Sequence, residues 1–405
     1  MRNLYPADWR IVTLGDITTL SQYGINSPSG EGSTYPMLRM NNIQSGSLDT
    51  KNLMYVELGS DEFEKFRLYP DDILINRTNS LELVGKSSIF RLSGDFVFAS
   101  YLVRFRLIDE ALPLYIHYYL NSEMGQQTLT SLATKGVSQA NINPTTLKKR
   151  FVIPLPPLPE QRAIAAILST WDEALTLTKR LIDALKRRKA ALMQLLLTGE
   201  VRFSEFDGAW EEIRLGDFLK LNLRKVAKPN NPYYALSLRN RGQGTLVRFV
   251  KDPTSVEMEH LYEVREGDLI VSITFAWEGS IAIACSDADG KLVSHRFPTY
   301  VFDKSKVNPD FFKHLMITDD FFFQLGLISP GGAGRNRVLS KKDFVQLTVN
   351  VPELAEQMKI GGLLSAYDEY IDGFESYLTQ LTTQKRGLMQ QLLTGTVRIE
   401  VDKEI

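Results

Sequence analysis

Residues 158–202 read LPEQRAIAAILSTWDEALTLTKRLIDALKRRKAALMQLLLTGEVR, and residues 354–398 repeat this segment as LAEQMKIGGLLSAYDEYIDGFESYLTQLTTQKRGLMQQLLTGTVR. The two copies align without a gap at an offset of 196 residues (354 minus 158). A segment this long is not one turn of a solenoid, whose repeats recur about every 20 to 50 residues. The chain therefore consists of two copies of a larger unit, each a globular part followed by the repeated segment. Two similar units in one chain can read a two-part target.

Both copies carry the hydrophobic repeat of a coiled-coil helix. Apolar residues recur at alternating spacings of four and three, the period at which one helix packs along another. In the first copy these seam positions are Ile164, Leu168, Trp171, Leu175, Thr178, Ile182, Leu185, Lys189, Leu192 and Leu196. In the second they are Ile360, Leu364, Tyr367, Ile371, Phe374, Leu378, Leu381, Lys385, Leu388 and Leu392. About 36 helical residues at 1.5 Å each give a rod of roughly 50 Å.

The ends of both segments carry boundary signals. Prolines precede the helices (Pro156, Pro157, Pro159 and Pro352), and Gly199 and Gly395 follow them. Proline fits the start of a helix and glycine fits just past its end. We therefore expect each helix to fill nearly the whole repeated segment.

Charge separates the two copies. Residues 151–202 hold 8 basic and 5 acidic side chains, whereas residues 351–405 hold 5 basic and 9 acidic ones. Opposite charge favours two helices that lie against each other. Lys189 and Lys385 share one seam position; either they fix the register or they reach past the seam to water. The basic cluster at 179–189 either contacts DNA phosphates or a partner, or is a solvated face that complements the acidic copy.

Bulk composition limits the class of protein. At 405 residues the chain is long enough for two or more domains with their own cores. A single cysteine, Cys285, excludes a disulfide framework and indicates a reducing compartment. No signal peptide and no apolar run near the ~18 residues of a membrane span are present, so we expect a cytoplasmic protein without membrane contact. The formal net charge of −1 means that any affinity for DNA must come from local patches.

The globular halves also correspond, in the same order along the chain. The paired features are Trp9 with residues 14–17 and Trp210 with 215–218; the apolar runs 72–75 and 268–271; the aromatic stretches 115–119 around His117 and 311–315 around His314; and the polar loops 135–141 and 331–337. The apolar runs read as buried strands and the aromatic stretches as helices. Strands mixed with a few helices predict an α+β fold in each half.

These features together resemble the specificity subunit of type I restriction-modification systems. The resemblance is carried by PLPPLPEQRAIAAIL (154–168) with LMQLLLTGEVRF (192–203), and by VPELAEQMKIGGLL (351–364) with LMQQLLTGTVRI (388–399). It covers essentially the whole chain, and its strength lies in the duplication. It implies target-recognition domains at 1–153 and 203–350, and conserved spacer helices at 154–202 and 351–405 that pair antiparallel as a coiled coil with pseudo-two-fold symmetry.

The resemblance also implies a function and partners. In that family each globular half reads one half of a split site in double-stranded DNA, and the helices dock two methyltransferase (M) subunits. Restriction (R) subunits join through them. S-adenosylmethionine, ATP and Mg are then expected on the partner subunits, with no cofactor and no catalytic residue on this chain.

Three motifs with a chemical meaning fall short of their patterns. Residues 80–87 miss the phosphate-binding loop because Ser80 stands where its first glycine belongs. Asn231-Pro232-Tyr233-Tyr234 lacks the second proline of the adenine methyltransferase motif. Gly331 to Gly334 has no strand–loop–helix context for phosphate. The four histidines are not at metal-ligand spacing, and His117 and His314 read as core or boundary residues.

Side chains suited to DNA gather on matching loops. Arginine, asparagine and glutamine read base edges, whereas lysine, serine and threonine hold phosphates. The candidates are Asn76, Arg77, Thr78, Asn79, Lys135, Ser138, Gln139 and Asn141 in the first half, and Arg239, Asn240, Arg241, Ser272, Thr274, Arg335, Asn336 and Arg337 in the second. The loops match in position but differ in side chains, as expected if the halves read different sequences. The alternatives are ordinary polar loops on a coiled-coil scaffold that binds no DNA, and a nucleotide-dependent enzyme built on residues 80–87.

Overall fold

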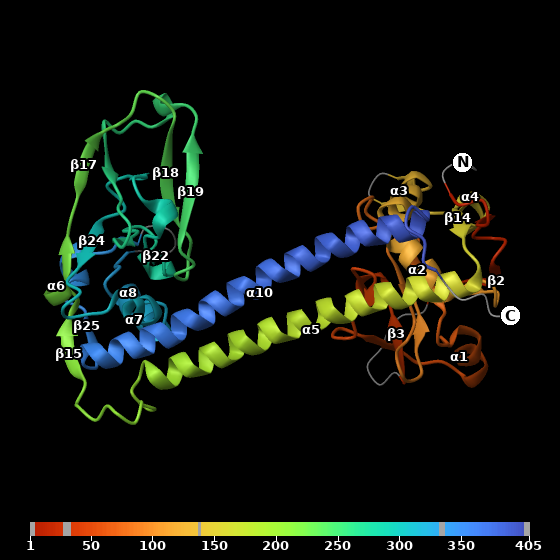
Figure 1. Ribbon diagram of the computed structural model, residues 1–405, viewed down its shortest axis with the longest axis horizontal. Helices are drawn as coiled ribbons and strands as arrows, with labels where there is room; N and C mark the ends of the chain where they lie inside the picture. Colours follow the sequence, from red (N-terminus) through yellow and green to blue (C-terminus); the bar gives the residue numbers. More distant parts are fainter. Residues whose placement is uncertain (1–4, 27–33, 137–138, 332–336, 401–405) are drawn as a thin grey trace. The chain divides into compact units, whose positions relative to one another are not determined.

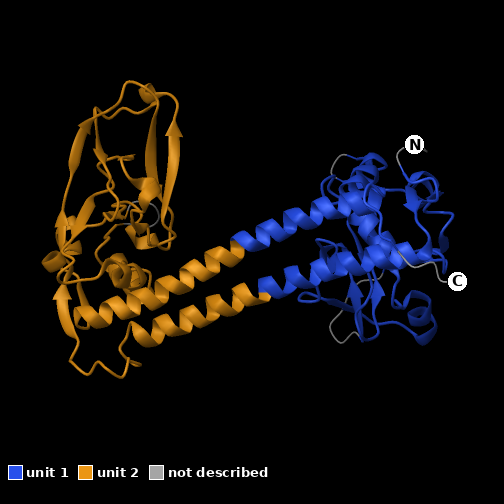
Figure 2. Ribbon diagram, viewed as in Figure 1, with its two compact units in different colours: residues 1–179, 376–405 blue, residues 180–375 orange. Residues whose placement is uncertain are grey.

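The computed structural model describes residues 5–26, 34–136, 139–331 and 337–400. It divides into two compact units, residues 1–179 with 376–405, and residues 180–375 (Figure 2). Each unit therefore combines one globular part with a segment of both long helices. No helix in the described ranges is long and apolar enough to cross a membrane.

The two repeated segments form the two long helices, α5 (Leu158–Leu196) and α10 (Leu354–Thr394) (Figure 1). Every predicted seam position is buried or half-buried, whereas Leu177 and Leu181, outside the seam, are exposed. Gly199 and Gly395 follow the helix ends with φ of +73° and +70°, in the left-handed region that favours glycine. The predicted helices and their seams are thus confirmed.

The long helices are antiparallel within each unit. In the first unit, Glu160 at the start of α5 pairs with Arg398 beyond the end of α10, and Asp172 pairs with Lys385 at 2.5 Å. In the second unit the same exchange links Glu356 to Arg202 and Asp368 to Lys189. Ascending numbers on one helix meet descending numbers on the other in both units. Because the two seam lysines pair with aspartates of the facing helix, they contribute to the register of the helix pair.

The first unit contains five small sheets. Its strands, in spatial order, are β1 (Arg10–Thr13) and β14 (Val152–Leu155); β2 (Thr18–Tyr23), β11 (Leu102–Leu107), β7 (Ile73–Asn76) and β9 (Ser87–Ile89); β10 (Val97–Phe98), β3 (Tyr35–Leu38) and β6 (Met54–Val56); β12 (Thr134–Lys135), β13 (Ala140–Asn141) and β8 (Thr78–Asn79); and β4 (Ile43–Gln44) and β5 (Ser47–Leu48). The central strand β7 is buried along its length, as the apolar run at 72–75 predicts.

The second unit repeats the first two of these sheets and enlarges the third. Its strands are β15 (Glu211–Arg214) and β25 (Thr348–Val351); β16 (Leu219–Leu221), β24 (Thr299–Phe302), β21 (Leu269–Val271) and β22 (Ile281–Ile283); and β17 (Arg224–Ala227), β20 (His260–Glu263), β23 (Leu292–Val293), β18 (Tyr233–Leu238) and β19 (Thr245–Val250). The four-stranded sheets β2-β11-β7-β9 and β16-β24-β21-β22 have the same order. Within the five-stranded sheet, β23-β18-β19 match β10-β3-β6 of the first unit, with one parallel and one antiparallel pair in each. Strands β17 and β20 have no counterpart in the described part of the first unit.

Short helices complete both units, and the last three in the described part of each unit follow in matching order. The first unit has α1 (Ser60–Phe66), α2 (Pro113–Asn121), α3 (Glu123–Ser131) and α4 (Pro144–Arg150), with a 3₁₀ turn η2 (Met40–Asn42). The second has α6 (Leu215–Phe218), α7 (Pro309–Leu315), α8 (Asp319–Leu327) and α9 (Lys341–Phe344), with 3₁₀ turns η3 (Pro253–Ser255), η4 (Ala276–Glu278) and η5 (Ser286–Ala288). Side-chain caps from Ser122 and Thr318 begin α3 and α8 at equivalent positions.

Each helix pair is packed into the core of its unit. Ile164, Leu168 and Leu392 belong to the main apolar cluster of the first unit, and Leu196, Ile360 and Leu364 to that of the second. The predicted α+β fold with two long helices is therefore confirmed. At the offset of 196 residues, the residue equivalent to His314 is Tyr118. Both Tyr118 and His314 contact a serine and an aspartate of the neighbouring long helix.

Candidate nucleic-acid interface

In the first unit the two predicted loops meet in one small sheet. Strand β8 pairs with β13, so that Thr78 lies opposite Asn141 and Asn79 opposite Ala140. Strand β12 adds Lys135 on the other side of β13. Segments about sixty residues apart in sequence therefore present their polar side chains together, next to the end of the buried strand β7.

A backbone junction fixes where this sheet starts. The amide of Arg77 donates to the carbonyl of Tyr101 at 3.0 Å, and the amide of Ile142 donates to the carbonyl of Arg77 at 2.8 Å. We call Arg77, Tyr101 and Ile142 the first junction. The two hydrogen bonds fix the amide and the carbonyl of Arg77. They do not involve its side chain.

The side chains near the first junction divide into buried and accessible ones. Asn76 is fully buried and its amide oxygen accepts from the Thr78 amide at 3.3 Å. Thr78 is also buried, with 8% exposed. The prediction of DNA contact is therefore corrected for these two residues, because neither presents a polar group at the surface. Asn79 is half-buried and its side chain accepts from the Ser80 amide at 2.8 Å.

Arg77 is different, since its guanidinium lies over the exposed ring of Tyr23, with Cζ 4.9 Å from the ring centroid. Lys135, Gln139 and Asn141 are exposed beside it in the small sheet or its connection. Ser138, also predicted, lies outside the described residues. The accessible set of the first unit is thus basic and amide-bearing, with aromatic rings next to it.

The second unit builds the same junction from different residues. The amide of Ile273 donates to the carbonyl of Arg296 at 2.9 Å, and the amide of Leu339 donates to the carbonyl of Ile273 at 2.7 Å. Ile273, Arg296 and Leu339 form the second junction, at the end of β21 as the first lies at the end of β7. Both junctions have the same backbone hydrogen bonds, but the arginine occupies different positions in them. In the first junction the arginine is the central residue, Arg77, whereas in the second it is Arg296, whose carbonyl accepts from the central residue.

The predicted turn Arg239–Arg241 lies against η4, just after the second junction. The amide of Arg241 donates to the carbonyl of Glu278 at 2.9 Å, and the Asn240 side chain donates to the Glu278 carboxylate. Arg239 and Arg241 are exposed, and Arg241 has a φ of +54°, a left-handed conformation unusual for a residue with a side chain. The turn therefore carries two arginines to the surface beside η4.

Three other predicted residues of the second unit have internal roles. Ser272 is fully buried, so its predicted DNA contact is corrected. Thr274 is half-buried, with its hydroxyl 3.4 Å from that of Ser272. The Arg337 guanidinium donates to the carbonyls of Ser329 at 3.0 Å and Gly326 at 2.7 Å, which satisfies the C-terminal end of α8. Arg335 and Asn336 lie outside the described residues.

Sequence reasoning missed three accessible residues at this interface. Tyr23, 50% exposed, lies under the Arg77 guanidinium, Tyr101, 48% exposed, accepts from the Arg77 amide, and Arg296 is exposed at the second junction. All three come from strands or loops distant in sequence from the predicted loops. A signal existed only for the tyrosines, because an exposed tyrosine on a strand end is a frequent contact residue. The sequence gives no indication of Arg296, because the residue that it contacts at the junction, Ile273, is apolar and does not suggest a DNA-binding site.

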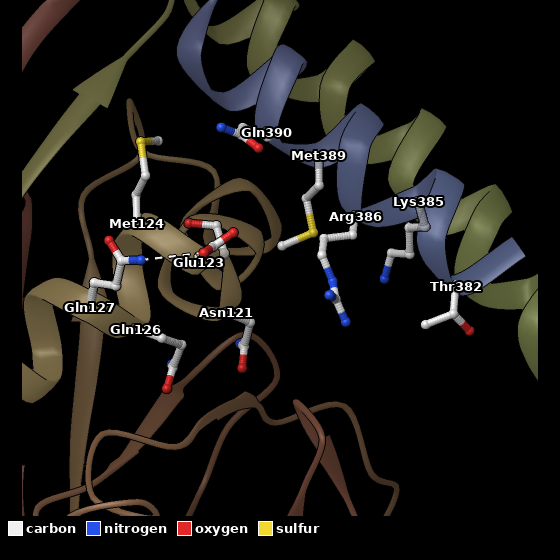
Figure 3. Close-up of a pocket in the computed structure, with 11 residues that line it drawn as sticks. Asn121, Glu123, Met124, Gln126, Gln127, Thr382, Lys385, Arg386, Met389 and Gln390 are labelled. Carbon is white, nitrogen blue, oxygen red and sulfur yellow. Dashed lines mark hydrogen bonds between the residues drawn. The ribbon is translucent and has the colours of Figure 1, made fainter. Parts of the chain in front are cut away.

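A hollow opens at equivalent places in both units. In the first unit, Glu123 and Gln127 of α3 face Lys385, Arg386 and Met389 of α10 across a cavity of about 540 Å³ (Figure 3). In the second, α7 and α8 face α5 across a cavity of about 790 Å³. Positions shared at the offset of 196 residues line both hollows: Ser122 with Thr318, Glu123 with Asp319, Met193 with Met389 and Gln194 with Gln390.

The near-miss motifs have structural explanations. In the loop 80–87, the Gly85 amide donates to the Asn76 carbonyl at 2.8 Å, so it is not available to a phosphate. Tyr233 and Tyr234 belong to β18. Across the described ranges, no three His, Cys, Asp or Glu side chains come together as a metal site. Burial lowers the pKa of both His117 and His314 to about 4, which fits their reading as core or boundary residues.

Comparison with known proteins shows which class of domain the chain resembles. Residues 6–187 match the family model described as "Type I restriction modification DNA specificity domain". The MjaX specificity subunit of Methanocaldococcus jannaschii is 27% identical, over 98% of this chain and 95% of its own length. The StySPI type I restriction enzyme specificity subunit of Salmonella potsdam is 24% identical, over 99% of this chain and 90% of its length.

A solved structure shares the fold. The type I restriction-modification S subunit from M. genitalium superposes with a TM-score of 0.59 at 17% identity, over 97% of this chain and 96% of that one. Over nearly its whole length the chain is thus similar to specificity subunits of type I restriction-modification systems, and residues 6–187 match the DNA specificity domain of those systems.

Proposed function

We propose that this chain is the non-catalytic subunit that reads a two-part site in double-stranded DNA, with each unit reading one half-site. The observation that carries the proposal is the pair of junctions. Both units hold the same backbone hydrogen bonds at the end of the same central strand, yet the side chains at those positions differ. A shared scaffold with unlike surface residues suits two readers of unlike sequences.

Phosphate and base contacts would come from the accessible residues of each unit. In the first unit these are Arg77, Lys135, Gln139 and Asn141, and in the second Arg239, Arg241 and Arg296. Arginine and amide side chains match base edges in the major groove, and lysine neutralises phosphates. Tyrosines beside Arg77 add apolar surface for sugar or base.

Two methyltransferase (M) subunits are the proposed direct partners, and restriction (R) subunits would join through them. Support comes from apolar residues exposed on the long helices outside the seam, namely Leu177, Leu181, Tyr370 and Tyr377, and from the two equivalent hollows. Equivalent surfaces in the two units favour a partner that binds twice. S-adenosylmethionine, ATP and Mg would then be bound by the partners, in the cytoplasm, and not by this chain.

Sequencing of methylated adenines in cells tests the function. With this chain and its partner methyltransferase expressed together, we expect methylation confined to a two-part motif, which disappears when this chain is omitted. Methylation that does not depend on the chain would contradict the proposal.

Binding should also depend on the partner. Because the units are nearly neutral overall, the isolated chain has little phosphate neutralisation to offer and should bind DNA weakly. A gel shift at several salt concentrations, with and without methyltransferase, measures this. A scaffold that binds no DNA would give no additional shift when the chain joins the methyltransferase.

A further inference from the structure

We propose that one arginine at each junction, Arg77 in the first unit and Arg296 in the second, determines specificity by reading a guanine in its half-site. The inference rests on the proposed DNA recognition and deepens it by naming the residue and the base. It concerns each unit by itself.

The guanidinium of Arg77 contacts the Tyr23 ring, but its hydrogen-bond donors are not used by the described part of the fold. Within the described part of the chain it forms no ion pair and no side-chain hydrogen bond, and its Nε is buried without a partner. Its backbone is held on both sides by Tyr101 and Ile142, and its side chain is stacked on Tyr23. A positioned arginine with free donors loses little conformational entropy when it binds a ligand.

Neighbouring arginines show what a structural role looks like in this protein. Arg106 donates to both carboxylate oxygens of the buried Asp72, at 2.8 and 3.0 Å. In the second unit Arg224 does the same to Asp268, at 2.5 and 3.0 Å. Arg77 lies near the end of the same sheet but has no carboxylate partner. The fold therefore does not account for its hydrogen-bond donors.

The second unit provides an internal control for this conclusion. At the position equivalent to Arg77 the same junction accommodates Ile273, with the same two backbone hydrogen bonds. The fold at this point does not require arginine. In the second unit the arginine is Arg296 instead, at the position equivalent to Tyr101. Arg296 is exposed, and no ion pair or hydrogen bond of its side chain occurs among the described residues.

Guanine is the ligand that fits this chemistry best. A guanidinium donates two parallel hydrogen bonds to O6 and N7 of guanine in the major groove, the commonest specific contact to a base. A phosphate would also accept from arginine, but it needs no stacked, pre-positioned donor. The exposed ring of Tyr23, over which the Arg77 guanidinium lies, favours a planar base edge over a solvated phosphate.

The test uses the full chain with its partner methyltransferase and a duplex DNA pool with randomised positions. The variants are Arg77→Ile, Arg77→Lys and Arg296→Tyr. Isoleucine and tyrosine are the residues that the opposite unit already tolerates at these places, so the variants should fold, which thermal melting verifies. Arg10→Ala, at an exposed arginine of β1, is the matched control.

The wild-type protein should select a guanine at one position of each half-site. Arg77→Ile should abolish that preference in one half-site only and weaken binding to the wild-type site roughly 10- to 100-fold. Arg296→Tyr should do the same in the other half-site. Arg77→Lys should keep the salt dependence of binding but relax the same position, because lysine cannot form the paired contact.

Two results would overturn the inference. Unchanged base preferences in Arg77→Ile would show that Arg77 reads nothing. Weaker binding to all sequences alike, with a shallower salt dependence, would make it a phosphate contact. If the wild-type protein selected no two-part motif, the proposed function itself would fail, and that result is visible without any variant.

Discussion

At the scale of single residues, equivalent places in the two units hold different chemistry. The hydroxyl of Tyr118 donates to Asp172 at 2.8 Å and lies 3.1 Å from the hydroxyl of Ser169. In the second unit, Nε2 of His314 lies 3.2 Å from the hydroxyl of Ser365 and 4.0 Å from Asp368. A titratable ring thus replaces a neutral phenol at the same packing position.

This substitution gives the second unit its own pH dependence. Burial lowers the pKa of His314 to about 4, and the charge of Lys189 acts in the same direction. In the unfolded chain the pKa of histidine is about 6.5, so the unfolded state binds the proton first as the pH falls. Stability is therefore full above about pH 6.5 and is lost as the pH drops toward 4.

We expect the His314→Tyr variant to lose less stability than wild type between pH 6.5 and 5, by about 2 kcal/mol. Urea unfolding at the two pH values measures the difference. The lower limit of pH 5 keeps most carboxylates ionised, and His117 is present in both proteins and cancels. Equal losses in the two proteins would contradict the assignment.

At the scale of elements, the start of each repeated segment forms an ion pair with the end of the other one. Glu160 accepts from Arg398 at 2.7 and 2.9 Å, and Glu356 accepts from Arg202 at 3.0 and 2.7 Å. The Glu-Gln start of each copy therefore binds the Val-Arg end of the other copy. Gln161 and Gln357 act alike beside them, accepting from the amides of Leu112 and Asn308 at 2.8 and 2.9 Å.

The two ion pairs should differ in how much their loss costs. Glu160 also accepts from the Trp9 indole at 3.0 Å, whereas the Trp210 indole nitrogen, in the second unit, is buried without a partner. Arg202→Ala would leave the fully buried Glu356 without its cation, a loss of about 3 kcal/mol. We expect Arg398→Ala to cost less, because Trp9 still holds Glu160.

Denaturant unfolding of Arg202→Ala and Arg398→Ala measures these costs. Glu356→Gln is the control, since it removes the buried charge together with the ion pair and should cost less than Arg202→Ala. Arg398 also pairs with the exposed Asp8, so Asp8→Ala is measured beside it. A loss in Arg398→Ala that exceeds that of Arg202→Ala by more than the loss in Asp8→Ala would show that Trp9 does not support Glu160.

The elements were largely predictable from the sequence, but the contacts between them were not. The seam of α5 and α10 and the buried strands β7 and β21 follow from local periodicity, which a single segment carries. The pairing of Glu160 with Arg398 joins residues 238 positions apart, and no local pattern encodes it. The prediction of Asn76 and Ser272 as surface residues is wrong because the first polar residue after each apolar run is still buried.

At the scale of the whole molecule, the first unit combines two separate stretches of chain, whereas the second is one continuous stretch. The first is built from residues 1–179 and 376–405, and the second from 180–375. Each long helix contributes residues to both units. A change in helix length therefore affects both of the proposed DNA-reading units. We therefore propose that the helices determine the number of unspecified base pairs between the half-sites.

Removal of one heptad from each helix tests this proposal. Because Asp172 pairs with Lys385, residues 175–181 of α5 match residues 376–382 of α10, and both segments would be deleted. Seven helical residues span about 10 Å, or about three base pairs at 3.4 Å. We expect a shorter spacer with unchanged half-sites, or loss of binding. An unchanged spacer would contradict the proposal.

The most direct test of two readers in one chain is an exchange of one of them. Residues 203–350 would be replaced by the corresponding part of another specificity subunit, and the complex with methyltransferase would select DNA from a random duplex pool. We expect a two-part motif in which one half-site changes and the other keeps its wild-type sequence. A motif that changes throughout, or that never had two parts, would contradict the account.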